Sequence, residues 1–179
     1  MSIPSLKLVK SFEDQDVTQC DFIIKLKTEK KVYVHRLVLL SKSALIEKLG
    51  VNGPNGQNTL VFPEEFSDKS VECCLKFLYG NELTLDEVDV ETAKQLMMIG
   101  AMFEVIGLED ESSAVLMELL TKNIVLDVWQ FMKINGFCRI LEKLGRYVCK
   151  YFDPSSLLKD IQNPEFAIWL SKYNNKNKK

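Results

Sequence analysis

The chain has 179 residues, of which 46% are hydrophobic and 27% charged; this balance is typical of one globular domain with a short extension and excludes a disordered or fibrous chain. The formal net charge of −2 argues against a nucleic-acid partner bound through a strongly basic face. No apolar run reaches the roughly 18–20 residues of a membrane helix and no secretory signal opens the sequence, so no membrane partner is expected.

The first part of the chain predicts strands alternating with helices. Residues 21–27 alternate in polarity, with Phe22, Ile24 and Leu26 on one face, and predict a strand that pairs as a hairpin with residues 32–34. Residues 35–49 then take a helical period, with one apolar face made of Leu37, Leu40, Ala44, Leu45 and Leu49.

After a turn rich in glycine and asparagine at residues 50–58, residues 59–62 predict a short strand. Ser67 is a candidate cap for a helix that Gly80 follows, at the position where a left-handed residue is expected. A further short strand is predicted at residues 83–85. Asp89 then caps a helix expected to run to about Ile106, with Gly107 as its end.

Everything beyond residue 108 has a helical period. Four apolar segments mark helices around residues 115–120, 128–132, 141–152 and 166–173, and Asp153-Pro154 is interpreted as the stop of the third. Residues 174–179 are polar and of low complexity, and are expected to be disordered. The predicted fold class is therefore α+β followed by an α-helical extension.

Little in the sequence points to catalysis. His35 is the only histidine, and it lies at a strand-to-helix junction that favours a structural role. Cys73 and Cys74 are adjacent on a predicted helix, so one is expected in the core and the other half-exposed or facing a partner. The five cysteines include no C-x-x-C unit, which indicates free thiols in the cytoplasm or nucleus and no metal site. The sequence also contains neither a G-x-x-x-x-G-K-[ST] nor a G-x-G-x-x-G motif, so no cofactor is expected.

A row of basic residues lies on the predicted helix of residues 141–152 and just before it. Its four basic residues are spaced by 4, 3 and 4 positions, which places them on one helix face: Arg139, Lys143, Arg146 and Lys150. This row fits either a solvated face or a docking surface for an acidic protein.

Four blocks in chain order resemble the BTB/POZ family over residues 17–108. Residues 20–24 (CDFII) and 34–43 (VHRLVLLSKS) are similar to its opening strand and to its Ala-His-Arg-x-[Val/Leu]-Leu-x-x-x-Ser helix. Residues 74–80 (CLKFLYG) and 101–108 (AMFEVIGL) resemble two later helices. Residues 116–123, 129–131 and 163–166 resemble a linker helix and part of a BACK domain. The resemblance divides the chain into residues 1–16, 17–108, 109–173 and the tail 174–179.

The resemblance implies a protein–protein interaction module and no enzyme. It implies a homodimer, or a pair with another BTB protein, in which Asp21 and Arg36 match the family's paired charges beneath the dimer contact. An amphipathic start and the first helix supply the remaining candidate dimer residues: Leu6, Val9, Phe12, Leu37 and Leu40.

The resemblance also makes cullin-3, the scaffold of a ubiquitin ligase, a candidate partner. Cullin-binding members commonly carry an apolar-x-Glu motif in the loop after the first helix, and residues 50–58 hold no such triplet, although residues 45–47 (LIE) have these letters inside the predicted helix. The candidate contacts lie in this region and in the linker helix: Leu45, Val51, Val115, Leu116 and Leu119. The alternative is a dimerisation or scaffold module that does not bind cullin.

Overall fold

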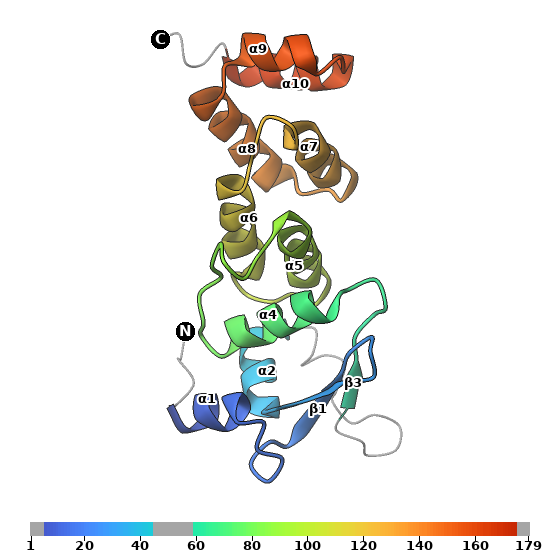
Figure 1. The fold of residues 1–179 in the computed structure, drawn as a ribbon, viewed down its shortest axis with the longest axis vertical. Helices are drawn as coiled ribbons and strands as arrows, with labels where there is room; N and C mark the ends of the chain where they lie inside the picture. Colours follow the sequence, from blue (N-terminus) through green and yellow to red (C-terminus); the bar gives the residue numbers. More distant parts are fainter. Residues whose placement is uncertain (1–5, 45–58, 175–179) are drawn as a thin grey trace. The chain divides into compact units, whose positions relative to one another are not determined.

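The computed structural model describes residues 6–44 and 59–174, and the chain divides into two compact units, residues 1–115 and 116–179. The amino-terminal unit holds a sheet and the first helices, whereas the carboxy-terminal unit is helical (Figure 1). Leu26 and Phe62, at the ends of two strands, are both buried, as expected for a core shared between sheet and helices. The α+β prediction is confirmed.

A mixed sheet of three strands forms the base of the amino-terminal unit. Strand β1 (Phe22–Lys25) lies in the centre, antiparallel to β2 (Lys31–Val34) and parallel to β3 (Thr59–Val61). The predicted hairpin is confirmed, with Phe22 opposite Val34 and Lys25 opposite Lys31. The order β2-β1-β3 leaves β2 with one unpaired edge in this sheet.

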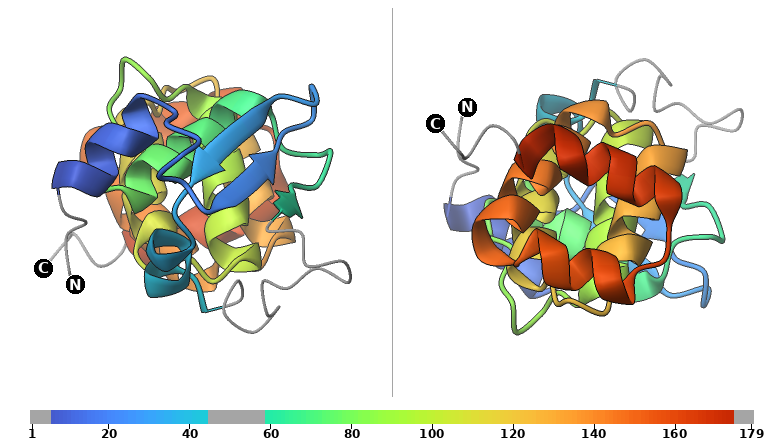
Figure 2. Two further views of the ribbon diagram at one scale, coloured as in Figure 1. Left: turned by 90° about the horizontal axis from the view of Figure 1, so that it is seen from below. Right: turned by 90° about the horizontal axis from the view of Figure 1, so that it is seen from above.

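One face of the sheet is buried and the other is more open. Phe22, Ile24, Val32 and Val34 are at most 6% exposed, because alternate side chains of both strands point toward the helices. Helix α4 (Asp68–Leu78) lies behind this face when the unit is viewed from the sheet side (Figure 2). The alternate residues of β1 and β2 face outward: Ile23, Lys25 and Tyr33 are partly buried, and Lys31 is exposed.

The other helices of this unit are α1 (Leu6–Glu13), α2 (Arg36–Lys42), α5 (Val90–Met102) and α6 (Leu108–Glu118), which extends past the division between the units. Both predicted caps are confirmed: the Ser67 hydroxyl group accepts from the backbone of Ser70, and the Asp89 carboxylate accepts from Thr92. Gly80 has a φ of +99°, the left-handed value expected after α4.

Three predicted boundaries in this unit are wrong. Helix α2 ends at Lys42 because the backbone of Ser43 is extended and pairs with Val105; the rest of the predicted helix, residues 45–49, lies outside the described residues. The same pairing explains why α5 ends at Met102 and not near Ile106. Residues 83–85 form no strand, and only Leu83 of the three is buried.

The carboxy-terminal unit is built from α7 (Val125–Ile134), α8 (Cys138–Tyr151), α9 (Pro154–Asp160) and α10 (Pro164–Asn174). Its core includes Trp129, Phe166 and Trp169, whose rings lie 5.4–5.9 Å apart between centroids. The basic row lies exposed on α8, opposite the buried side chains of Leu144 and Val148.

Helix α9 was not predicted. Pro154, interpreted as a stop, occupies the first turn of α9, where a missing N–H costs nothing, and Asp153 caps this helix by accepting from the backbone of Ser155 and Ser156. Asp153-Pro154 therefore both ends α8 and begins the next helix.

The prediction for the paired cysteines is half wrong, because Cys73 and Cys74 are both buried, at 6% and 1% exposure. Burial raises the pKa of the Cys74 thiol to about 12, so it is a packing residue. Over the described ranges 6–44 and 59–174, no helix is long and apolar enough to cross a membrane. The same ranges contain no cluster of side chains that could hold a metal ion.

Candidate interaction site

A buried polar chain joins α1 to the beginning of α2. The Tyr79 hydroxyl group accepts a hydrogen bond from the backbone N–H of His35 at 2.8 Å and lies 2.7 Å from its Nδ1. On the other side of the ring, Nε2 lies 3.0 Å from the hydroxyl oxygen of Ser11, which donates to the carbonyl of Leu8. All groups are satisfied when Tyr79 donates to Nδ1 and Nε2 donates to Ser11, the tautomer that we assign.

This network gives His35 the structural role expected from its position. The side chain is 6% exposed, and burial raises the pKa of Tyr79 above its usual range. Within the described part of the chain, the imidazole contacts hydroxyl groups and the Cys20 thiol, at 4.0 Å, and no carboxylate orients it. The ring therefore holds α1, α2 and the end of α4 together.

Asp21 and Arg36, predicted as a charged pair, meet through the backbone. Oδ1 of Asp21 accepts from the backbone N–H of Arg36 at 2.7 Å, which satisfies a donor in the first turn of α2. The Arg36 guanidinium lies 6.0 Å from the centroid of the Phe22 ring. Asp21 thus acts as a cap supplied from the start of β1, since His35 makes no side-chain cap of its own.

The candidate dimer residues differ in how far they reach the surface of this chain. Leu6 on α1 is 89% exposed and Leu37 on α2 is 69% exposed, whereas Val9 and Leu40 are half-buried. Phe12 is 9% exposed because its ring stacks on Tyr79 at a centroid distance of 4.0 Å. The dimer role of these residues stays a prediction, and Leu6 and Leu37 are the members most available to a partner.

The candidate cullin contacts fall into two groups. Leu45 and Val51 lie outside the described residues. In the linker helix, Val115 and Leu116 are buried at 8% and 0% exposure, and Leu119, just after α6, is half-buried. Leu119 is therefore the most accessible of the three candidate contacts in the linker region, and all five contacts remain predictions.

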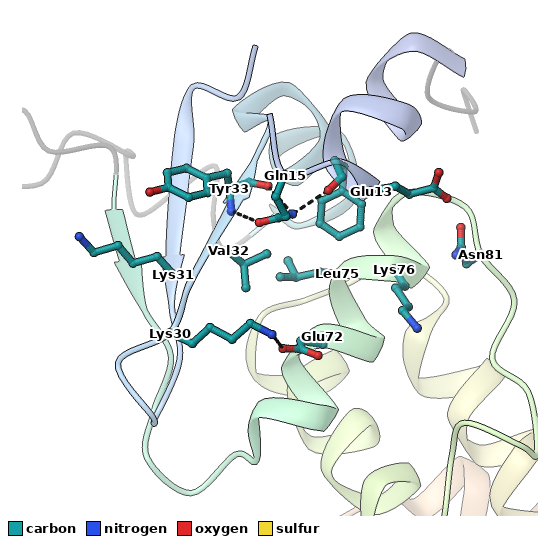
Figure 3. Close-up of a pocket in the computed structure, with 11 residues that line it drawn as sticks. Glu13, Gln15, Lys30, Lys31, Val32, Tyr33, Glu72, Leu75, Lys76 and Asn81 are labelled. Atoms are coloured by element: carbon teal, nitrogen blue, oxygen red, sulfur yellow. Dashed lines mark hydrogen bonds and ion pairs between the residues drawn. The ribbon is translucent and has the colours of Figure 1, made fainter. Parts of the chain in front are cut away.

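A groove that the sequence did not predict runs between β2, the end of α1 and α4 (Figure 3). Its volume is about 540 Å³. Phe12, Val32 and Leu75 give it an apolar floor, and the ion pair between Lys30 and Glu72, 2.6 Å long, lies beside it. The groove belongs wholly to the amino-terminal unit.

Sequence reasoning missed two residues that organise this region. Tyr79 was predicted only as part of a helix end, yet its hydroxyl group bonds to His35 at the start of α2 and its ring stacks on Phe12 of α1. Gln15 carried no signal at all, because a glutamine in a polar turn is ordinary, but its carboxamide bonds to β2, which is 18 residues away in sequence. Neither contact has a local pattern that could have revealed it.

Comparison with known proteins is consistent with this architecture. No curated protein matched the sequence. The BTB/POZ domain model matches residues 9–120, so the match takes in most of α1 and extends through α6, beyond the boundaries of 17 and 108 suggested by the resemblance; no family match covers the BACK-like extension. BTB/POZ domains mediate protein–protein interaction and dimerisation, and theirs is not an enzyme family. Because the match covers more than half of its residues, this chain belongs to the BTB/POZ family.

Proposed function

We propose that the chain is a homodimeric interaction module whose dimer contact is formed by α1 and α2. The observation that carries this proposal is the exposure of Leu37, 69%, on a short helix whose neighbouring residues Val38 and Leu39 are buried. An exposed leucine costs little alone, but Leu6 on the adjacent helix is also 89% exposed. A two-fold contact would bury Leu6 and Leu37 of both chains, because the same surface of each chain takes part.

The test is the molar mass of the chain in solution, measured by light scattering over a range of concentrations. The wild-type chain is expected at the mass of two chains, and Leu37→Glu at the mass of one, because a buried carboxylate would face its copy across the two-fold axis. Ile168→Glu is the matched control, since Ile168 is 65% exposed on α10 and lies outside the proposed contact. A monomeric wild-type chain, or a dimeric Leu37→Glu variant, would contradict the proposal.

We further propose that this module is an adaptor for a cullin-3 ubiquitin ligase in the cytoplasm or nucleus, with residues 109–173 acting as a linker helix and partial BACK-like region. Support comes from the family resemblance and from the free thiols, which suit a reducing compartment. The absence of an apolar-x-Glu triplet in residues 50–58 favours the alternative, a scaffold that does not bind cullin.

Calorimetry with the amino-terminal domain of cullin-3 separates the two functions. An adaptor is expected to bind with a submicromolar dissociation constant, which corresponds to a binding free energy of about 8 kcal/mol or more in magnitude. Leu119→Glu is then expected to weaken binding, while Ile168→Glu does not, because Ile168 lies on a helix outside the proposed contact. No heat of binding at tens of micromolar, from chain shown to be dimeric, would rule out the adaptor and leave the scaffold function.

A further inference from the structure

The unpaired edge of β2 has a defined set of outward backbone groups. In an antiparallel pair the hydrogen-bonded positions alternate, and Leu26 donates to the carbonyl of Lys30, which fixes the alternation. Lys31 and Tyr33 are then the β2 residues that make no backbone hydrogen bond to β1, so the N–H and C=O groups of these two residues point away from the sheet. These four groups are what another strand could bind.

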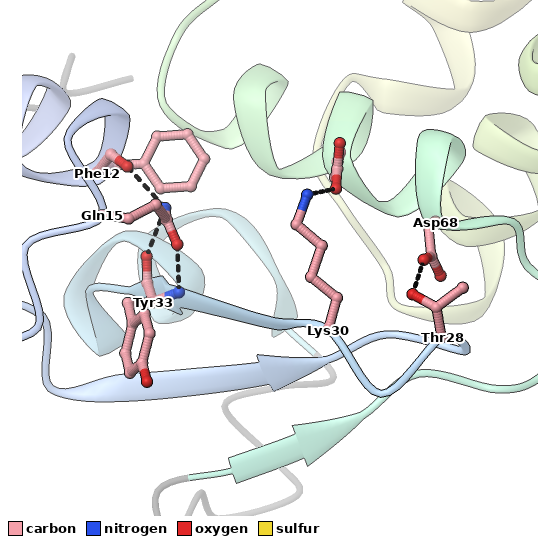
Figure 4. Close-up of polar contacts among 7 residues, drawn as sticks. Phe12, Gln15, Thr28, Lys30, Tyr33 and Asp68 are labelled. Atoms are coloured by element: carbon pink, nitrogen blue, oxygen red, sulfur yellow. Dashed lines mark hydrogen bonds and ion pairs between the residues drawn. The ribbon is translucent and has the colours of Figure 1, made fainter.

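Gln15 already occupies the Tyr33 half of this edge. Its Oε1 accepts from the Tyr33 N–H at 2.8 Å, and its Nε2 donates to the Tyr33 carbonyl at 3.3 Å and to the Phe12 carbonyl at 2.7 Å (Figure 4). A carboxamide has the same donor and acceptor as a peptide group, so the side chain stands in for one residue of a neighbouring strand. Gln15 itself has a φ of +49°, an uncommon backbone conformation for glutamine.

The Lys31 half of the edge is open. No hydrogen bond from the residues that the structure describes reaches the backbone of Lys31 on its outward side. The groove with the floor of Phe12, Val32 and Leu75 runs beside this edge, where alternate side chains of an added strand would point. The edge therefore offers backbone groups for affinity and an apolar groove for side chains, which is how sheets bind extended peptides.

Charge indicates which peptide would fit. Lys25 and Lys31 lie opposite each other across the hairpin, Lys27 is exposed in its turn, and none of these three forms an ion pair with the described residues. Of these, only Lys31 belongs to β2, and a second copy of this strand would add further positive charge at the same edge, which is repulsive. An acidic peptide would neutralise them.

We propose that the outer edge of β2 binds an extended peptide segment of another protein in which acidic and apolar residues alternate, and that this segment displaces the carboxamide of Gln15. The apolar side chains enter the groove beside Leu75, and the acidic ones face the lysines of the hairpin. Among the candidate dimer residues, only the buried Phe12 also lines this groove, whereas the exposed Leu6 and Leu37 do not, so the proposed site does not depend on dimerisation.

The test uses the full chain and a fluorescein-labelled peptide of about eight alternating Glu and Val residues, with binding followed by fluorescence anisotropy. The same peptide N-methylated at alternate amides is the ligand control, since it keeps the charges and side chains but cannot extend a sheet. We expect saturable binding of the first peptide and none of the second. Leu37→Glu is expected to bind as the wild type does, so a failure here is distinguishable from a failure of the dimer proposal.

Protein variants locate the peptide. Gln15→Ala removes the internal competitor and is expected to bind several-fold more tightly, whereas Gln19→Ala, a nearby glutamine that bonds to Asp16, should not differ from wild type. Tyr33→Pro removes an outward N–H that β1 does not use, which an edge strand tolerates, and is expected to weaken binding about tenfold or more. Circular dichroism verifies that this variant is folded.

Charge reversal keeps the proposal falsifiable if Tyr33→Pro does not fold. Lys31→Glu is expected to weaken binding several-fold, and Lys150→Glu, in the basic row of α8, to leave it unchanged. The proposal is overturned if neither the wild type nor Gln15→Ala binds saturably. It is also overturned if the N-methylated peptide binds equally well, or if Lys150→Glu and not Lys31→Glu weakens binding.

Discussion

Tyr79 is the residue on which the polar interior of the amino-terminal unit depends. Its hydroxyl group serves two polar groups of His35, and its ring stacks on Phe12 with an angle of 7° between the planes. Tyr79 and His35 are both buried, so water cannot replace a hydrogen bond that is lost between them. The hydroxyl group and the ring can be separated experimentally because phenylalanine keeps the ring alone.

Tyr79→Phe is expected to lower the free energy of unfolding by about 1–3 kcal/mol, because it leaves the His35 N–H and Nδ1 buried without a partner. Urea denaturation measures the change. Tyr33→Phe is the matched control: the Tyr33 hydroxyl group makes no hydrogen bond within the described residues, and its removal should change stability by less than about 0.5 kcal/mol. Equal losses in the two variants would contradict the assigned network.

Asp89 is a capping residue whose charge makes stability depend on acid. Its carboxylate accepts from Lys69 Nζ at 2.6 Å and from the backbone N–H of Thr92 at 2.8 Å, and these bonds lower its pKa from 3.8 to about 2. Because the folded pKa is the lower one, the stabilisation is complete above about pH 4 and is lost as the pH falls toward 2.

Asp89→Asn is therefore expected to cost stability at neutral pH and progressively less below about pH 4. The amide keeps the acceptor for Thr92, so the cap remains and the difference isolates the charge. Urea denaturation at about pH 6 and about pH 2.5 measures it. Asp14→Asn is the control for removing one exposed carboxylate elsewhere, and a wild type that keeps its full advantage over Asp89→Asn at the lower pH would refute the assignment.

At the scale of whole elements, local chemistry predicted where most elements begin and tertiary contacts decided where several end. The caps Ser67 and Asp89 could be predicted from the sequence because a capping side chain bonds to a backbone N–H only three residues ahead. The end of α2 could not be predicted in this way, because it depends on the pairing of Ser43 with Val105, which lies far along the chain. Asp153-Pro154 was correctly predicted to end a helix, but the same two residues are also typical of a helix start.

The packing of α8 against α10 depends on Gly145. A Cβ atom there would lie 2.5 Å from the nearest ring atom of Tyr173, well inside normal contact. Gly145 is buried, and the two helices are in direct contact at this point. In an exposed helix the change from glycine to alanine would add about 1 kcal/mol of stability, so the sign of the effect reports the contact.

Gly145→Ala is expected to lower the midpoint of thermal unfolding, observed by tryptophan fluorescence. This signal reports the carboxy-terminal unit, since both tryptophans, Trp129 and Trp169, are buried in it. The control is the same change in a Tyr173→Ala background, where the ring is absent and alanine should now stabilise α8. A higher midpoint for Gly145→Ala alone would mean that Tyr173 moves aside without cost.

At the scale of the whole molecule, the candidate site could be predicted only in part. Leu37 could be identified from the family pattern because it lies inside a contiguous motif. The groove and the edge of β2 could not, because they arise where α1, a strand and α4 meet and Gln15 reaches a strand 18 residues away. Such a site has no sequence period, and only the fold brings its parts together.

Dimerisation, if it proceeds through α1 and α2, also has a signature in the stability of the entire molecule. Unfolding then requires dissociation, so a hundredfold increase in concentration adds about 2.7 kcal/mol per dimer, or roughly 3–6 °C in the midpoint for chains of this size. The wild-type midpoint, measured by circular dichroism, should rise accordingly, and that of Leu37→Glu should not change. A wild-type midpoint independent of concentration would show that the folded chain is stable as a monomer, and the exposed leucines of α1 and α2 would then need another partner.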